Sequence, residues 1–241
     1  MRALKPVRQF ERSVRAARAR RADPLGVALA ERLQRERLTF LATEPLLDLR
    51  RRGLEMERRG VPGIVLEAGC ALGGSAIMLA ASKERERRLQ VQNVFGVIPP
   101  PGEKDGDDVH ARYGTIAAGQ AAGFDGDVYY GYQPELKQKV ARSFEAFGYP
   151  CAAHNVSLVE GLFEATVQPD GPVALAHLDG DWYESVRVCL DRVWPALSVG
   201  GVIVVDDYDA WSGCRRAVDE FLSSHPECQV EHRSRLHLLR I

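Results

Sequence analysis

The sequence lacks the features of several classes of protein. No run of about 18 apolar residues, the length of a membrane-spanning helix, occurs in its 241 residues. The start of the chain has no apolar centre of the kind found in secretory signals. We therefore expect a cytoplasmic protein without a membrane partner. A chain of this length is expected to bury one core in a single α/β domain.

Cysteine is scarce. The five cysteines are scattered along the chain and form no C-x-x-C pair, the spacing that many zinc sites use. Their odd number does not suit a framework of disulfides either. We expect reduced thiols, in keeping with a cytoplasmic protein.

A strong net charge is also missing, but the balance of -1 hides an asymmetry. Residues 1–59 hold 16 Lys and Arg against 8 Asp and Glu, whereas the rest holds 16 against 25. A basic front could bind nucleic acid or another anionic partner. Arg15, Arg18 and Arg21 fall at helical spacing with no aromatic residues interleaved, which favours a solvated or subunit-contacting helix. We expect no nucleic-acid partner.

The chain changes character near residue 60. Before it, helical patterns cover 8–22, 27–37 and 43–58, so residues 1–60 are expected to form a helical extension or lid. From 61 to 241, short apolar runs alternate with amphipathic stretches, which indicates βαβ units and a parallel sheet. The expected strands are 63–68, 91–97, 155–159, 173–178, 201–206, 228–233 and 235–241, and the expected helices are 74–87, 133–147, 183–197 and 213–224.

These elements predict an α/β, Rossmann-like domain. Its mostly parallel, seven-stranded sheet has helices on both faces and closes with an antiparallel strand, because no helix separates the last two strands. Residues 99–132 do not follow the alternation and are rich in Pro, Gly and Asp and then in aromatic residues. We interpret them as an insertion that forms a lid or substrate loop, with a surface excursion as the alternative.

A glycine-rich turn follows the first expected strand. Glu67, Gly69, Gly73 and Ser75 lie in it, and a helix of small and apolar residues comes next. Glycine lets the backbone turn sharply and lets a ligand approach. The acid two residues before the first glycine would repel a pyrophosphate, so the turn favours the amino-acid end of S-adenosylmethionine. A plain tight turn would also explain the glycines.

Carboxylates follow the fourth and fifth expected strands. Asp179 and Asp181 come after the fourth, and Asp206 and Asp207 come directly after the apolar run GVIVV. The carboxyl ends of parallel strands share one edge of a sheet. Like charges packed there need a cation, and hard oxygen ligands indicate Mg²⁺. The alternative, in which these acids cap helices, would account for Asp181 but not for the Asp206-Asp207 pair.

A metal beside a methyl donor has a clear task. Coordination lowers the cost of deprotonating a hydroxyl group and fixes its oxygen in line with the methyl group. A carboxylate can then remove the proton. Asp181 is our first choice for that base, and His177 is interpreted as a packed core histidine.

The chain resembles the macrocin O-methyltransferase family of metal-dependent sugar methyltransferases, from Leu38 onward. The Asp-Gly-Asp-x-Tyr segment followed by Asp-Asp-Tyr is the most specific part of this resemblance. The motifs that carry it are Val61-Pro62-Gly63, Glu67-x-Gly69-x-x-x-Gly73-Gly74-Ser75, Phe95 with Pro99, His177-x-Asp179-Gly180-Asp181-x-Tyr183, Pro195-x-Leu197-x-x-Gly200-Gly201, Asp206-Asp207-Tyr208 and Gly213-Cys214-x-x-Ala217-Val218-Asp219-x-Phe221.

The resemblance implies a class I methyltransferase fold, S-adenosylmethionine and Mg²⁺ as cofactors, a hydroxyl of a sugar or glycosylated small molecule as acceptor, and a homodimer. It implies that Asp179, Asp206 and Asp207 bind the metal, with Asp179 also next to the cofactor and catalytic together with Asp181. The cofactor residues implied are Glu67, Gly69, Gly73 and Ser75 for the methionine part, Asn93 for the ribose, and Glu160 and Gly161 for the adenine side.

Two departures from the family pattern bear on the substrate. Asn93 stands where the family commonly has Asp, and the segment from Phe95 to Tyr132 is longer than in the antibiotic-sugar enzymes. A related group, the catechol and caffeoyl-CoA O-methyltransferases, often has a lysine where this chain has Trp182. A phenolic acceptor therefore stays an alternative, as does a non-catalytic metabolite-binding module. Trp182 either stacks on a sugar ring or belongs to the core.

Overall fold

The computed structural model describes residues 21–241, and within them it confirms the expected fold class. A seven-stranded sheet has the order β3-β2-β1-β4-β5-β7-β6. Strands β1 to β5 are parallel, and β7 pairs antiparallel with both β5 and β6. The strands are β1 (Ile64–Ala68), β2 (Leu89–Asn93), β3 (Val156–Glu160), β4 (Val173–Leu178), β5 (Leu197–Val205), β6 (Gln229–His232) and β7 (Leu236–Leu239).

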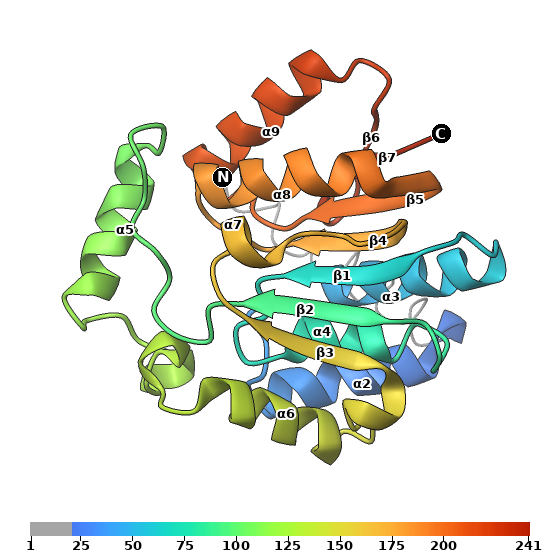
Figure 1. The fold of residues 1–241 in the computed structure, drawn as a ribbon. Helices are drawn as coiled ribbons and strands as arrows, with labels where there is room; N and C mark the ends of the chain where they lie inside the picture. Colours follow the sequence, from blue (N-terminus) through green and yellow to red (C-terminus); the bar gives the residue numbers. More distant parts are fainter. Residues whose placement is uncertain (1–20) are drawn as a thin grey trace, which may run out of the picture.

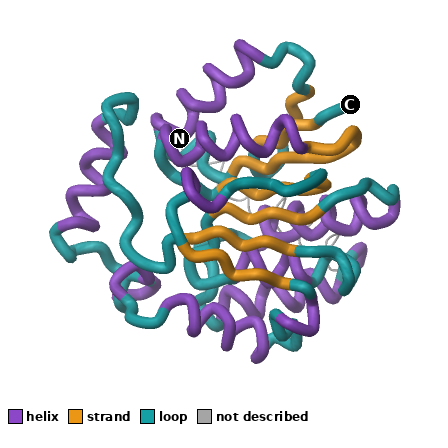
Figure 2. The backbone as a smooth tube through the Cα atoms, viewed as in Figure 1, coloured by secondary structure: helices purple, strands orange, loops and turns teal. Residues whose placement is uncertain are grey.

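Helices cover both faces of the sheet (Figures 1 and 2). The strand side chains alternate: Val65 packs into the core on one face and Leu66 into the core on the other. The first face carries α2 (Pro24–Arg35), α3 (Thr43–Arg58), α4 (Gly74–Ala80) and α6 (Leu136–Ala146), and the second carries α8 (Tyr183–Ala196) and α9 (Ser212–Ser224). The short α7 (Phe163–Thr166) and the 3₁₀ turn Ala152–His154 flank β3.

The helices α2 and α3, which precede the first strand, pack onto the sheet as part of the same domain. The helix expected over 8–22 lies, except for its last two residues, outside the described part. Asp23 caps α2 by accepting a hydrogen bond from the Gly26 N–H at 2.8 Å. Leu33 of α2 and Leu46 of α3 are fully buried in the core of the first face. The extension therefore shares the core of the domain.

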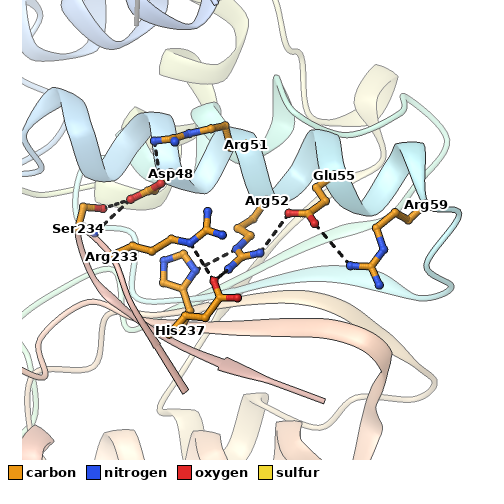
Figure 3. Close-up of polar contacts among 9 residues, drawn as sticks. Asp48, Arg51, Arg52, Glu55, Arg59, Arg233, Ser234 and His237 are labelled. Atoms are coloured by element: carbon orange, nitrogen blue, oxygen red, sulfur yellow. Dashed lines mark hydrogen bonds and ion pairs between the residues drawn. The ribbon is translucent and has the colours of Figure 1, made fainter. Parts of the chain in front are cut away.

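A buried polar network ties α3 to the last strands (Figure 3). Arg52 is 2% exposed, and its Nε donates to Nδ1 of His237 on β7 at 3.0 Å. Its other nitrogens bind Glu55 and Glu231. Burial, and then the charge of Arg52, lowers the pKa of His237 to about 4. The histidine thus stays neutral and accepts the arginine's hydrogen bond.

The inserted segment contains a helix that the sequence pattern did not predict. Within residues 99–132, α5 (Asp107–Ala117) and the 3₁₀ turns Phe124–Gly126 and Tyr130–Tyr132 form. Figure 1 shows α5 beyond the carboxyl ends of the parallel strands. The Pro- and Gly-rich start of the insertion concealed this helix. Its first turn carries Asp107 and Asp108, and acidic residues at this end are favoured by the helix dipole.

Some expected boundaries were wrong. The second strand spans Leu89–Asn93, not 91–97, since the backbone of Phe95 turns into the left-handed region with φ 47°. The helix expected over 74–87 is α4, which ends at Ala80. Just after this end, the Ser82 hydroxyl donates to the Leu79 carbonyl. The fifth strand begins at Leu197, directly after α8. No helix of the described residues is long and apolar enough to cross a membrane.

Candidate active site

The carboxyl ends of the three central strands bring the predicted site together. Ala68 of β1 is in register with Leu178 of β4, which is in register with Val205 of β5. The Asp179 N–H donates to the Ala68 carbonyl at 2.8 Å, and the Asp206 N–H donates to the Leu178 carbonyl at 2.9 Å. The residues that follow these strands are therefore neighbours at the edge where such folds bind ligands.

Three carboxylates form a cluster at this edge. Asp179, Asp181 and Asp207 each offer an oxygen, and these atoms lie within 4.8 Å of one another. Burial and then the charge of Asp207 raise the pKa of Asp179 well above its usual range. Burial and then the charge of Asp181 do the same for Asp207. Such a set of hard oxygens fits a divalent cation, which would relieve the repulsion.

Asp181 joins the cluster through an unusual backbone conformation. Its φ of 54° lies in the left-handed region, which a non-glycine residue adopts at a cost. Its N–H donates to Oδ2 of Asp207 at 3.3 Å. Burial and then the charge of Asp179 raise its pKa to about 7.

Asp206 has different partners. Its Oδ1 accepts a hydrogen bond from Nε of Arg235 at 2.7 Å and lies 3.5 Å from Nε2 of His177. Burial raises the pKa of this carboxyl, but the bonds to His177 and Arg235 outweigh it and hold the pKa below the usual value. The ligand set Asp179, Asp206 and Asp207 stays a prediction, since only Asp179 and Asp207 of it belong to the cluster.

His177 links Asp206, at the end of β5, to Glu67, at the start of the glycine turn. It is fully buried, as expected, with Nδ1 3.3 Å from Oε1 of Glu67. Burial lowers its pKa, but hydrogen bonds to Asp206 and Glu67 raise it well above the ordinary value. Ser75 donates its hydroxyl to the same Glu67 oxygen. The sequence pattern gave no sign of these contacts, because the residues come from separate elements.

The glycine turn has the geometry that the sequence predicted. Gly69 has φ 90°, and a Cβ there would lie 1.9 Å from the carbonyl oxygen of Asp179. Gly73 has φ 95°, and α4 begins directly after it. A side chain at Gly69 would block the close approach of the first and fourth strand ends.

Four of the eight predicted cofactor residues line one hollow. Gly69, Asn93, Gly161 and Asp179 line it together with Leu162 and Phe163. Glu67 Oε2 and Asn93 Nδ2 are buried without a hydrogen-bond partner among the described residues, as expected of atoms that await a ligand. Glu160 is exposed, and its carboxylate lies 3.6 Å from Nζ of Lys137. Its predicted role on the adenine side has less support from this geometry.

A second cavity, of about 330 Å³, opens beside the carboxylates. Trp182 is 3% exposed, and its indole N–H donates to the Pro99 carbonyl at 3.0 Å, so it is both a core residue and a cavity wall. Sequence reasoning missed Phe40, Arg112, Trp211 and Arg235, which line this cavity with Tyr129, Tyr130 and the acids Asp179, Asp181, Asp206 and Asp207.

Comparisons with known proteins identify the family of the chain. Residues 12–229 match the family described as Macrocin-O-methyltransferase (TylF). The demethyldecarbamoylnovobiocin O-methyltransferase of Streptomyces niveus is 30% identical over 195 residues, which are 76% of this chain and 67% of that protein. The mycinamicin III 3''-O-methyltransferase of Micromonospora griseorubida is 32% identical over 178 residues, 70% of this chain and 63% of that protein.

Solved structures share the fold. The O-methyltransferase NovP has a TM-score of 0.70 at 24% identity and covers 84% of this chain and 82% of its own. The calicheamicin methyltransferase CalS11 has a TM-score of 0.59 at 19% identity, and the match covers 81% of this chain and 77% of CalS11. At these identities the likeness concerns the fold alone.

Proposed function

Because the chain belongs to the macrocin O-methyltransferase family and is an S-adenosylmethionine-dependent O-methyltransferase, we propose that it methylates a hydroxyl of a sugar or glycosylated small molecule with the help of Mg²⁺. Support for the acceptor comes from the names of the relatives, which are O-methyltransferases of natural products. In one of these names the methylated compound, a tetracenomycin C derivative, carries a rhamnosyl group. Support for the metal comes from the carboxylate cluster.

The methyl donor is expected to occupy the hollow beside the glycine turn. Glu67, Gly69, Gly73 and Ser75 would hold its methionine part, and the unpaired oxygen of Glu67 can accept from its ammonium group. Asn93 would bind the ribose with its unpaired amide N–H. Gly161 and Glu160 would lie along the adenine.

Mg²⁺ would be held by Asp179 and Asp207, with Asp206 as the third predicted ligand; when bound it supplies a Lewis acid that makes the acceptor hydroxyl easier to deprotonate. Asp181 takes the hydroxyl proton as the oxygen–methyl bond forms and the sulfur–methyl bond breaks. Asp181 is placed for this task, since its carboxylate lies in the cluster with Asp179 and Asp207, next to where the acceptor hydroxyl would be held.

The acceptor is expected in the second cavity. Its aromatic walls, which include Phe40, Tyr130 and Trp182, can stack on a sugar ring. Trp182 also stands where catechol methyltransferases often have a lysine, which favours a sugar over a phenol.

The extension and the insertion are proposed to close this cavity together. Phe40 stacks on Phe124 with ring centroids 3.9 Å apart, and Nη1 of Arg37 lies 2.7 Å from Oδ2 of Asp127. Phe40 and Tyr129 both line the cavity. Arg37 and Phe40, in the extension predicted over residues 1–60, would thus form part of a lid on a methyltransferase domain formed by 61–241.

Three finer points are also proposals. A homodimer would cover exposed apolar side chains such as Leu25, which is 76% exposed. A cytoplasmic location agrees with the five free thiols. A small-molecule acceptor, rather than nucleic acid or membrane, agrees with a cavity of about 330 Å³.

Methyl transfer from labelled S-adenosylmethionine to a panel of glycosides and catechols tests this proposal. We expect turnover with glycosides, loss of turnover in EDTA, and recovery with Mg²⁺. Asp207→Asn should abolish turnover while cofactor binding, measured by calorimetry, persists. Full activity in EDTA, or methylation of catechols alone, would contradict the proposal.

A further inference from the structure

The inward face of α5 carries a positive charge. Val109 and Ile116 are buried, and Arg112 lies between them on the same side of the helix, three residues from one and four from the other. His110 and Thr115 are exposed. The helix therefore directs Arg112 inward, and the half-buried side chain lines the second cavity opposite the carboxylates.

The Arg112 guanidinium has no carboxylate within 4.0 Å among residues 21–241. Its Cζ lies 5.7 Å from the centroid of the Tyr129 ring. Arg235, in the same cavity, lies 2.7 Å from Oδ1 of Asp206. One of these two cavity arginines is thus paired, and the other is held over an aromatic face.

A half-buried cation without an anionic partner is costly, unless a ligand supplies the partner. The acids of the cavity form no ion pair with Arg112 within 4.0 Å, although its charge offsets part of the burial and the repulsion from Asp179 that raise the pKa of Asp181. Asp206 is taken by Arg235, and Asp179, Asp181 and Asp207 form the cluster proposed to face the metal and the acceptor proton. Among the described residues that line the cavity, Arg112 is then the positive charge without an ion pair.

We propose that Arg112 binds an anionic group of the acceptor, a carboxylate or a phosphate, so that the acceptor is an acidic or phosphorylated sugar derivative. Guanidinium forms paired hydrogen bonds with both groups. Arg112 and the Tyr129 ring near it both line the cavity, so the guanidinium is available to a ligand bound there. The inference rests on the proposed function, since it concerns the acceptor of that same site.

Binding to the protein loaded with S-adenosylhomocysteine and Mg²⁺ provides the test, with two matched pairs of probes. One pair is 4-nitrophenyl glucoside and 4-nitrophenyl glucuronide, and the other is glucose and glucose 6-phosphate. We expect the charged member of at least one pair to bind about tenfold more tightly or better, a difference of about 1.4 kcal/mol. The pair that shows the preference identifies carboxylate or phosphate as the group.

Variants connect the preference with this residue. Arg112→Gln should remove it, Arg112→Lys should restore part of it, and Arg142→Gln, at an exposed position on α6, should leave it unchanged. Equal binding of both members of every pair by the wild type, including no binding by either, would overturn the proposal, as would a preference that survives in Arg112→Gln.

The binding experiment can fail independently of the proposed function. If neutral glycosides are methylated in a Mg²⁺-dependent way but the charged probes bind no better, only the role of Arg112 is refuted. If the charged probes are preferred but Mg²⁺ has no effect on methyl transfer, the metal assignment fails and the role of Arg112 stands.

Discussion

Arg235 donates from Nε to Oδ1 of Asp206 at 2.7 Å and so joins the turn between β6 and β7 to the end of β5. The guanidinium supplies a fixed positive charge next to the carboxylate cluster. The turn itself is held by α3, since Asp48 accepts a hydrogen bond from the Ser234 N–H at 3.2 Å. The front helix thereby supports the position of a charge in the active site.

Arg235→Gln should lower the thermal stability of the metal-free protein and increase the stabilisation that Mg²⁺ provides. The Asp206 carboxylate loses one of its two partners and keeps His177, which costs about 1–3 kcal/mol of the free energy of unfolding. The more negative edge should then bind Mg²⁺ more tightly. Thermal unfolding with and without Mg²⁺ measures both effects. Arg233→Gln, in the same hairpin but pairing with the exposed Glu231, is the control; equal shifts in the two variants would contradict this role.

Stability should fall in acid because of His237. Its folded pKa of about 4 lies below the ordinary value, as burial and the charge of Arg52 disfavour the proton. As pH falls from about 6.5 to 4, the unfolded chain binds a proton that the folded chain does not, so this contribution is complete above 6.5 and lost toward 4. Urea unfolding across this range measures it. His237→Asn should flatten the dependence of stability on pH, because asparagine does not titrate while its amide oxygen still accepts from Arg52. His110→Asn, at an exposed position, should leave the dependence unchanged.

Gly69→Ala should disrupt the site and the fold. The added Cβ would meet the Asp179 carbonyl oxygen at 1.9 Å, at a φ of 90°, and we expect a loss of about 2 kcal/mol or more in unfolding free energy. Gly114→Ala is the matched control, because a Cβ there meets nothing within 4 Å and should stabilise α5 by about 0.5–1 kcal/mol. Denaturation midpoints of the two variants should move in opposite directions.

Phe124→Ala should weaken closure of the cavity without changing cofactor affinity. It removes the ring that stacks on Phe40, and aromatic pairs contribute about 0.5–1.5 kcal/mol beyond their buried area. We expect a severalfold rise in the acceptor KM with an unchanged Kd for S-adenosylhomocysteine. Val128→Ala, at a 62% exposed position nearby in sequence, should change neither. An unaltered KM in Phe124→Ala would contradict the proposed lid.

The fold could be predicted because its signals are local. Alternating apolar runs and helical spacing identified the sheet, the antiparallel closure and α3, which spans the expected Thr43–Arg58. The motif order around Asp179 and Asp206 identified the family, and the match over residues 12–229 confirms it. The helix α5 was missed because the preceding Pro- and Gly-rich stretch dominates the local pattern.

The site was only partly predictable because its remaining parts depend on long-range contacts. The strand ends place Asp179 and Asp207 together, as expected, but the left-handed turn that brings Asp181 to them has no sequence signal. The pairing of Asp206 with Arg235 joins the residue that follows β5 to the turn between β6 and β7, which lie 29 positions apart in the sequence. Arg112 could have been found from its spacing between Val109 and Ile116, had the helix been recognised.

The central claim, a divalent cation held by the carboxylates at the strand ends, is tested most directly by titrating Mn²⁺ into the protein and measuring the free ion by electron paramagnetic resonance. We predict one bound ion per chain, displaced by Mg²⁺, and none in the Asp179→Asn, Asp207→Asn double variant. That variant should stay folded, since the substitutions relieve repulsion between buried acids. A folded wild type that binds no Mn²⁺, or a double variant that binds it equally well, would contradict the claim.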